Sequence, residues 1–292
     1  MKAAKFYVFA TFVASALMAL AQPAGYELVW SDEFDGSELN NAVWTAEFNG
    51  NGGGNQELQY YSPVNVTVSD GCLHLTAKRQ ELNGRPFTSG RIYSMDKVFF
   101  TYGYVESRMC LPKTANGLWP AFWLLGNDME HNPWPNCGEI DVLEMGHSDG
   151  ISAGTQERLF NGACHWGPYI DGHHSEYARS STHPSSLQDG KFHTFGLLWT
   201  ADKIEMFVDH NVEPYFSLSI NDSADLGATS RAFRHDFFLV YDLAVGGIFT
   251  GILNPKDITA LPTVGAQSEL LVDYVRVYQP AGAVNLISPK AE

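Results

Sequence analysis

The sequence predicts an all-β fold in which two antiparallel sheets pack as a sandwich. Short segments with alternating apolar and polar residues recur along the chain, turn residues separate them, and hardly any long stretch has helical periodicity. A chain of 292 residues with 45% hydrophobic content is long enough for one large core. Because all-β domains of this size are commonly single, we expect one domain.

The strand candidates follow one another at short intervals. "NVTVSDGCLHLTAKR" (65–79) alternates on both sides of an Asp-Gly turn, and "KIEMFVDHNVEPYF" (203–216) does so around Asp209 to Asn211. Many short strands of this kind indicate a sandwich. The remaining candidates are residues 26–34, 102–111, 191–200, 236–247 and 269–279.

The two ends of the chain differ from its middle. Lys2 and Lys5 precede a short apolar run that ends in Ala-Leu-Ala, which predicts a secretory signal peptide at residues 1–21. The run is shorter than the ~20 residues of a membrane span. We therefore expect a secreted or periplasmic protein without a membrane span in the mature chain. Residues 22–280 would form the domain and residues 281–292 a loose C-terminal tail.

The charge balance excludes some partners. A net charge of -15 with only 18 Lys and Arg argues against binding to nucleic acid or to an anionic membrane surface, because both require a basic patch. We expect the mature chain to be a monomer.

Four cysteines, Cys72, Cys110, Cys137 and Cys164, leave two interpretations open. Their even number and an oxidising compartment permit one or two disulfides. Each lies in an apolar, strand-like segment, however, which favours free buried thiols. None of the four cysteines has the CxxC spacing that is typical of a zinc site, which argues against one.

The stretch "CGEIDVLEMG", residues 137–146, places three acids in a run that otherwise resembles a strand. Glu139 and Asp141 share a face, whereas simple alternation would send Glu144 to the opposite face. Burying carboxylates together is costly, because desolvation and like charges both raise their pKa values. Aromatic segments upstream and downstream argue against a solvated strand face.

A β-bulge resolves the spacing of these acids. One extra residue among Val142 and Leu143 would return Glu144 to the face of Glu139 and Asp141. The outer two acids are then about 13 Å apart at Cα, at about 3.3 Å per residue over four steps. Side chains that lean inward can shorten this to the roughly 5 to 5.5 Å between carboxyl groups that a retaining glycosidase requires.

"GEIDVLEMG" resembles the active-site strand of glycoside hydrolase family 16, in the bulged E-x-D-x-x-E form of laminarinases, agarases and related enzymes. The resemblance covers residues 26–279, and its laminarinase branch matches best. It implies a jelly-roll, concanavalin-like sandwich with an open substrate cleft on the concave face. Other segments in the family's order are "VWSDEFDG", "GGGNQELQYYS", "TSGRIYS", "GLWPAFWLLG", "CHWG", "LAVGG" and "VDYVRVYQ".

The resemblance implies roles that the chemistry of the acids also requires. Glu139 would be the nucleophile, Glu144 the acid/base, and Asp141 a partner that assists the nucleophile through a hydrogen bond. His165 in "ACHWG" would lie on the neighbouring strand, near the acid/base or the leaving-group sugar.

Aromatic rings and hydrogen-bonding side chains are the usual contacts of a bound sugar. Trp119 and Trp123 are four residues apart on a predicted strand and therefore share a face. We expect Trp123 to stack on the sugar at the cleavage point and Trp119 to serve the next subsite. Phe122, on the opposite face, is the better core residue.

Further substrate contacts follow from the resemblance. Asn55 and Arg91 match positions that reach sugar hydroxyls, and we also expect Trp134 and Trp166 to line the cleft. Asp242 stands where the family usually has Asn before "LAVGG", which changes the hydrogen bonding of a subsite. The polar stretch 145–161 is expected to form a loop at the cleft rim.

Catalysis of this kind needs no metal. Many family members carry a structural calcium on the face away from the cleft, and Glu27, Gly71 and Asp273 are the matching positions. Oxygen ligands suit Ca²⁺. A structural calcium is therefore an expectation that rests on the resemblance alone.

The sequence favours a secreted retaining endo-β-1,3-glucanase that also accepts mixed β-1,3/1,4-glucan, with β-glucan polysaccharides and oligosaccharides as its partners. One alternative is a hydrolase of marine galactans, of the agarase, porphyranase or carrageenase type. A non-catalytic glucan-binding module would lack one of the two glutamates. A transglycosylase stays open, because a covalent intermediate can pass to a sugar as well as to water.

Overall fold

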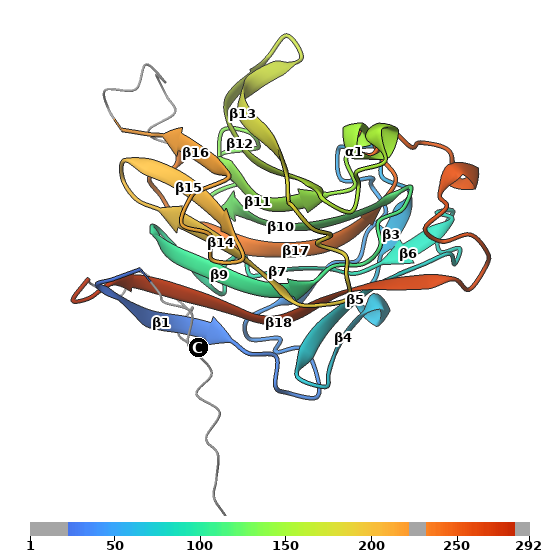
Figure 1. Cartoon of the computed structure of the whole chain (residues 1–292), viewed down its shortest axis with the longest axis horizontal. Helices are drawn as coiled ribbons and strands as arrows, with labels where there is room; N and C mark the ends of the chain where they lie inside the picture. The colour runs from blue at the N-terminus through green and yellow to red at the C-terminus, as the bar shows by residue number, and fades with distance from the viewer. Residues whose placement is uncertain (1–22, 222–231, 284–292) are drawn as a thin grey trace, which may run out of the picture.

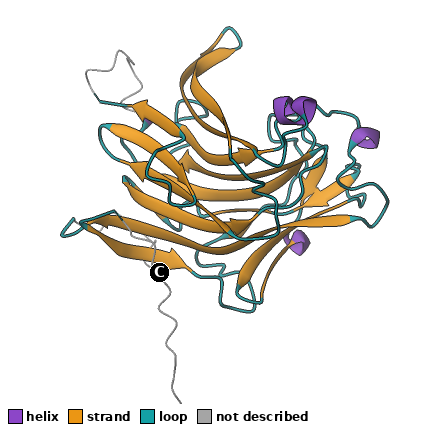
Figure 2. Ribbon diagram, in the orientation of Figure 1, coloured by secondary structure: helices purple, strands orange, loops and turns teal. Residues whose placement is uncertain are grey.

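The computed structural model describes residues 23–221 and 232–283, which form two sheets stacked face to face (Figure 1). The predicted all-β sandwich is confirmed. The helical elements that the structure describes in full are α1 (Ser148–Ala153) and the single turns η1 (Pro63–Asn65) and η2 (Pro255–Asp257) (Figure 2). The predicted signal peptide and residues 284–292 lie outside the described residues. No helix of the described part is both long and apolar enough to cross a bilayer.

One sheet has ten strands in the order β16-β15-β14-β9-β18-β5-β6-β3, with β1 beside β18 and β4 beside β5. All of its pairs are antiparallel except β3 with β6. Its strands are β1 (Tyr26–Asp32), β3 (Gln59–Tyr61), β4 (Val66–Ser69), β5 (Cys72–Lys78), β6 (Phe87–Ser89), β9 (Gly103–Cys110), β14 (His193–Trp199), β15 (Lys203–Val208), β16 (Phe216–Ser219) and β18 (Gln267–Pro280).

The other sheet has eight strands in the order β13-β12-β11-β10-β17-β7-β2, with β8 beside β17. It carries the residues predicted for catalysis. Its strands are β2 (Thr45–Ala46), β7 (Arg91–Tyr93), β8 (Phe99–Phe100), β10 (Leu118–Gly126), β11 (Glu139–Met145), β12 (Leu159–Ile170), β13 (His173–Thr182) and β17 (Phe237–Val245).

The core lies between the two sheets. Phe122 on β10 stacks on Tyr241 on β17 with ring centroids 4.7 Å apart, and the Tyr241 hydroxyl donates to Ser107 on β9 at 2.8 Å. This hydrogen bond satisfies a buried polar group and ties one sheet to the other. Phe122 is fully buried, as its position on the strand predicts.

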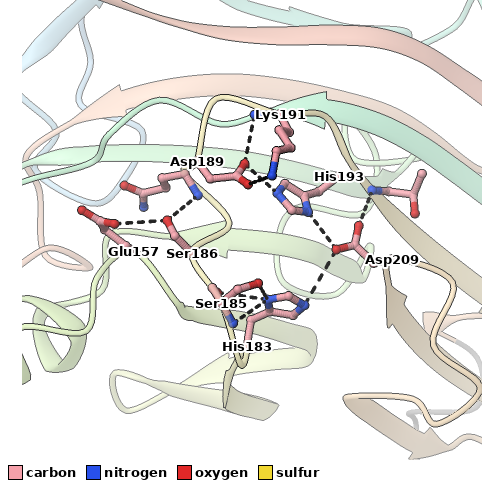
Figure 3. A network of polar contacts seen from close by, with 10 residues as sticks. Glu157, His183, Ser185, Ser186, Asp189, Lys191, His193 and Asp209 are labelled. Carbon is pink, nitrogen blue, oxygen red and sulfur yellow. Dashed lines mark hydrogen bonds and ion pairs between the residues drawn. The ribbon is translucent and has the colours of Figure 1, made fainter.

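The hairpin of β12 and β13 extends beyond the other strands of its sheet (Figure 1). The chain then crosses from β13 to β14 in the opposite sheet. Polar contacts hold this crossover: His193 at the start of β14 lies 2.7 Å from Asp209 in the turn after β15 and 3.2 Å from Asp189 (Figure 3). His183 lies 3.7 Å from the same Asp209 carboxylate.

The residues matched to a structural calcium site do not come together. Glu27 pairs with Gln279, whereas Asp273 lies six residues earlier on β18, so about 20 Å of strand separates them. Asp273 instead forms an ion pair with Arg108 at 2.5 Å. Glu27, Gly71 and Asp273 therefore do not fit a shared calcium ion.

Candidate active site

The bulge predicted from the spacing of the acids is present in β11. The register between β11 and β12 shifts between Asp141 and Glu144, and Val142 and Leu143 are both fully buried in the core. One residue is thereby taken out of the alternation. Glu139, Asp141 and Glu144 consequently line the same cleft.

This cleft has a volume of about 570 Å³ and lies on the face of the eight-stranded sheet turned away from the core. Its lining among the described residues is strongly acidic, with a single guanidinium and no lysine. The carboxylates are those of Glu57, Glu139, Asp141, Glu144, Glu176 and Asp242, and the guanidinium is that of Arg91.

Burial sets the proton affinities of the three acids. Desolvation raises the pKa of Glu139 to about 8, with Asp141 adding to the shift and the charges of His165 and Arg91 opposing it. Desolvation also raises the pKa of Asp141 and that of Glu144 well above their usual ranges. Such a cluster retains at least one proton near neutral pH, which a general acid requires.

His165 lies opposite Glu139 in the pairing of β11 with β12. Its Nε2 atom is 3.4 Å from an Asp141 oxygen and 3.9 Å from a Glu139 oxygen. The sequence prediction placed this ring near the acid/base or the leaving-group sugar. Its ion-pair contacts on β11 are with the predicted nucleophile and its assisting aspartate, and its charge also opposes the rise in the pKa of Glu144. The ion-pair contacts follow from the register, which pairs Glu144 with Asn161, four residues before His165.

Trp119 positions the predicted acid/base. Its indole Nε1 donates to Glu144 Oε1 at 3.0 Å, and its ring stacks on Phe249 with centroids 4.5 Å apart. Only 8% of Trp119 is exposed, so little of its ring is free for a sugar. The predicted subsite role therefore suits this residue less well than a role in orienting Glu144.

Trp123 lies in the cleft on the same face of β10 as Trp119, as predicted. Its Nε1 donates to Asp242 at 2.7 Å, and the Arg91 guanidinium lies 4.9 Å from its ring centroid. Arg91 in turn forms an ion pair with Glu47 at 2.8 Å. Asp242 is thus a buried hydrogen-bond acceptor for Trp123, and burial raises the pKa of Asp242 to about 7.

Asn55 and Trp134 also line the cleft, at positions far from each other in the sequence. Trp134 is 41% exposed and offers ring surface to a ligand. The prediction for Trp166 is wrong. It is only 6% exposed and packs edge-on against Phe233 in the core, because it follows the cleft-facing His165 directly on β12 and adjacent residues of a strand face opposite ways.

Comparisons with known proteins agree with this geometry. A family model described as Beta-porphyranase A-D, GH16 domain, matches residues 27–280. The "Beta-glucanase" of Rhodothermus marinus is 35% identical over 262 residues, which cover 87% of this chain and 85% of that protein. The chain belongs to glycoside hydrolase family 16.

Solved family 16 structures overlay on most of the chain. A mixed-linkage glucan enzyme from Bacteroides ovatus, in complex with a product, has a TM-score of 0.76 and 36% identity, and covers 86% of this chain and 100% of its own. A laminarinase catalytic domain from Thermotoga petrophila has a TM-score of 0.74 and 32% identity, covering 88% and 99%. The chain is also 33% identical to the clotting factor G alpha subunit of Tachypleus tridentatus, of whose length the match spans only 34%.

Several residues of this family 16 cleft were not found from the sequence. His174 and Glu176 reach the cleft from β13, and His147 and Phe249 reach it from loops. The stretch 145–161 contains the short helix α1 instead of only a loop, although His147 does lie at the cleft as a rim position would require. Alternation along β13 would have placed His174 and Glu176 on one face, but this strand had not been recognised.

Proposed function

We propose that this family 16 chain is a secreted, retaining endo-β-glucanase that hydrolyses β-1,3-glucan and accepts mixed β-1,3/1,4-glucan. The observation that carries the proposal is the bulge, which places Glu139, Asp141 and Glu144 together on the cleft wall. The printed activities of the similar Rhodothermus, Bacteroides and Thermotoga proteins support a glucan as the substrate. The signal peptide expected at residues 1–21 supports export.

The reaction proceeds in two displacements. The Glu139 carboxylate attacks the anomeric carbon while Glu144 gives its proton to the departing oxygen, which breaks the glycosidic bond and leaves a glycosyl ester on Glu139. Glu144, now ionised, then takes a proton from water, and the water oxygen attacks the same carbon and releases Glu139. Two inversions leave the product with the substrate's anomeric configuration.

The charge of the cleft distinguishes glucan from a sulfated galactan. The name of the matching family model favours a porphyran substrate. Among the described residues, however, the cleft contains six carboxylates, and Arg91 is its only permanently charged cation, which is already paired with Glu47. Sulfate groups would meet repulsion there, whereas a neutral glucan would not.

Release of reducing ends tests the substrate. Laminarin, barley-type mixed-linkage glucan, agarose and porphyran are incubated side by side with the purified protein and with Glu139→Gln as the inactive control. We expect release from both glucans and none from either galactan. Activity on agarose or porphyran without activity on a glucan would overturn the substrate, and release of equal amounts by Glu139→Gln would overturn the nucleophile.

A further inference from the structure

Three side chains with metal-binding atoms meet on the hairpin of β12 and β13, beside the catalytic acids. His165 on β12 pairs directly with Glu176 on β13, and His174 lies two residues before Glu176. Paired residues and residues two apart lie on one face of a hairpin. All three side chains accordingly line the cleft.

The ligand atoms have the spacing of a tetrahedral metal site. His165 Nδ1 lies 2.9 Å from His174 Nε2 and 3.4 Å from Glu176 Oε2, and the last two atoms are 3.7 Å apart. Ligands at 2.0–2.2 Å from a tetrahedral zinc ion are roughly 3.4 Å from one another. We propose that His165, His174 and Glu176 form a Zn²⁺ site at the edge of the cleft.

The surroundings hold the imidazole of His174 in place. The Trp134 ring meets it edge-on at 4.7 Å, and the Tyr169 ring stacks along it at 6.0 Å. The side chains of His165 and His174 are only 18% and 15% exposed, whereas that of Glu176 is 57% exposed. Two fixed imidazoles and one accessible carboxylate need little rearrangement to bind an ion.

The donor set selects the class of metal. Two imidazole nitrogens and a carboxylate suit Zn²⁺ and the neighbouring transition metals, whereas Ca²⁺ and Mg²⁺ prefer oxygen ligands alone. Three protein ligands leave a fourth position on the cleft side for water or a sugar hydroxyl.

Zinc at this site would act on the active site through the ring of His165. When Nδ1 binds the metal, the ring proton resides on Nε2, the atom that lies 3.4 Å from Asp141 and 3.9 Å from Glu139. His165 would thus be a positioning residue whose tautomer the metal fixes. The site goes beyond glucan hydrolysis and does not depend on which polysaccharide is the substrate.

Calorimetric titration with zinc chloride tests the site. The full mature protein is first treated with a chelator, and binding and thermal unfolding are then followed without any substrate. We expect one tight equivalent of Zn²⁺ and a rise in Tm of about 5–10 °C at a hundredfold excess over Kd. Absence of tight binding to the wild-type protein would refute the proposal.

Variants on the hairpin locate the ion. His174→Ala and Glu176→Gln should each weaken binding by more than the roughly 10–100-fold that loss of an outer-shell partner costs. His173→Ala is the matched control, because His173 is exposed and precedes His174 on the alternate face. Within residues 23–221 and 232–283, Glu139, Asp141 and His165 form the other group close enough to share an ion. Binding that survives His174→Ala and Glu176→Gln but is lost in Asp141→Asn would place the metal there and overturn this site.

Discussion

Glu139 and Glu144 are both buried at one bulge, but their neighbours differ. Glu139 has His165 at 3.9 Å, and the charge of Arg91 also favours its ionised form. Glu144 receives a hydrogen bond from the neutral indole of Trp119. The charge of His165 opposes the rise in the pKa of both glutamates, so the difference between them is Arg91, which acts on Glu139. This additional cation offsets part of the desolvation of Glu139, which suits Glu139 as the nucleophile and Glu144 as the proton donor.

Azide rescue distinguishes the two glutamates. In Glu144→Ala both the acid and the base are lost, so hydrolysis of natural glucan should fall by about 10²–10⁴-fold. An aryl glycoside needs little protonation of its leaving group, so the glycosyl intermediate should still form and accumulate. Azide needs no base and should restore turnover, giving a β-glycosyl azide by attack on the intermediate.

Azide added to the Glu139→Ala variant should give a product of the opposite anomeric configuration. Without the Glu139 carboxylate, azide enters directly from the face that this side chain occupied and yields the α-glycosyl azide. Proton NMR of the two products measures their anomeric configuration. Identical configurations from the two variants would show that the roles are assigned wrongly.

Among single residues, alternation along a strand was the most reliable guide from the sequence. It placed Trp123 in the cleft and Phe122 in the core, and it would have placed Trp166 in the core had it been applied to β12. The stacking of Phe249 on Trp119 could not be foreseen, because Phe249 lies on a loop and reaches β10 only through the tertiary fold. Contacts between distant segments have no local signal in one sequence.

The crossover from β13 to β14 depends on a buried histidine. A hydrogen bond from His193 to Asp209 raises the pKa of His193, and Asp189 contributes in the same direction while burial opposes both. Burial pushes the pKa of Asp209 upward, but its hydrogen bonds and the charges of His193 and His183 lower it overall. The folded state therefore favours the charged form of each partner.

This ion pair predicts a pH dependence of stability. Since folding raises the pKa of His193, its contribution is fully present below pH 6.5 and is lost as the pH rises through the folded-state value. The contribution of Asp209 is present above about pH 4 and is lost as the pH falls. We expect the free energy of unfolding to decline on the alkaline side by about 1 kcal/mol, a low value for a charged hydrogen bond because a third of the Asp209 side chain is exposed.

Urea denaturation at a series of pH values measures this effect. His193→Gln should remove the alkaline decline, whereas His173→Gln, in the exposed tip of the β12–β13 hairpin, should retain it. The other charged groups that face His193 are Asp189, His183 and, through Asp189, Lys191 (Figure 3). An unchanged pH profile in His193→Gln would contradict the assignment to this histidine.

At the level of elements, strands with clear alternation were predicted with nearly correct ends. The Asp-Gly hairpin appears as β4 and β5, and the segment 102–111 appears as β9. The second hairpin was predicted over residues 203–216 with a short turn at Asp209 to Asn211. The observed connection is longer, since β15 ends at Val208 and β16 begins only at Phe216. β13 was missed because most of its residues are polar and exposed, so alternation is weak there. β12 was expected only as the strand beside the acids, from the resemblance around His165.

For the whole molecule, the sequence determined the sandwich and the bulge but not the pairing of distant strands. The positions matched to calcium illustrate this: Glu27 would have to lie near Asp273, and the register of β1 on β18 places them six residues apart. The same lack of long-range information left the state of the four cysteines open. The structure has all four as free thiols.

The strand order separates Cys72 from Cys110, although both lie in the ten-stranded sheet. Cys72 on β5 and Cys110 on β9 are separated by the intervening strand β18, hence by about 9.6 Å of sheet, and two Cα atoms more than about 7 Å apart cannot be bridged. Cys164 is packed in the core between the sheets, whereas Cys137 belongs to a separate small cluster with Leu125.

Thermal unfolding with and without a reducing agent tests this arrangement in the whole protein. Loss of a native disulfide typically costs 2–5 kcal/mol, which in a domain of this size would lower Tm by about 4–20 °C. Because no bridge is present, we expect the reductant to leave Tm unchanged. Burial also raises the pKa of Cys137 to about 12 and that of Cys164 well above its usual range, so these two thiols should resist alkylation until the chain unfolds. Mass spectrometry after iodoacetamide treatment in guanidinium, without prior reduction, should find four labelled cysteines, and a count of two or none would demonstrate disulfides that this structure does not contain.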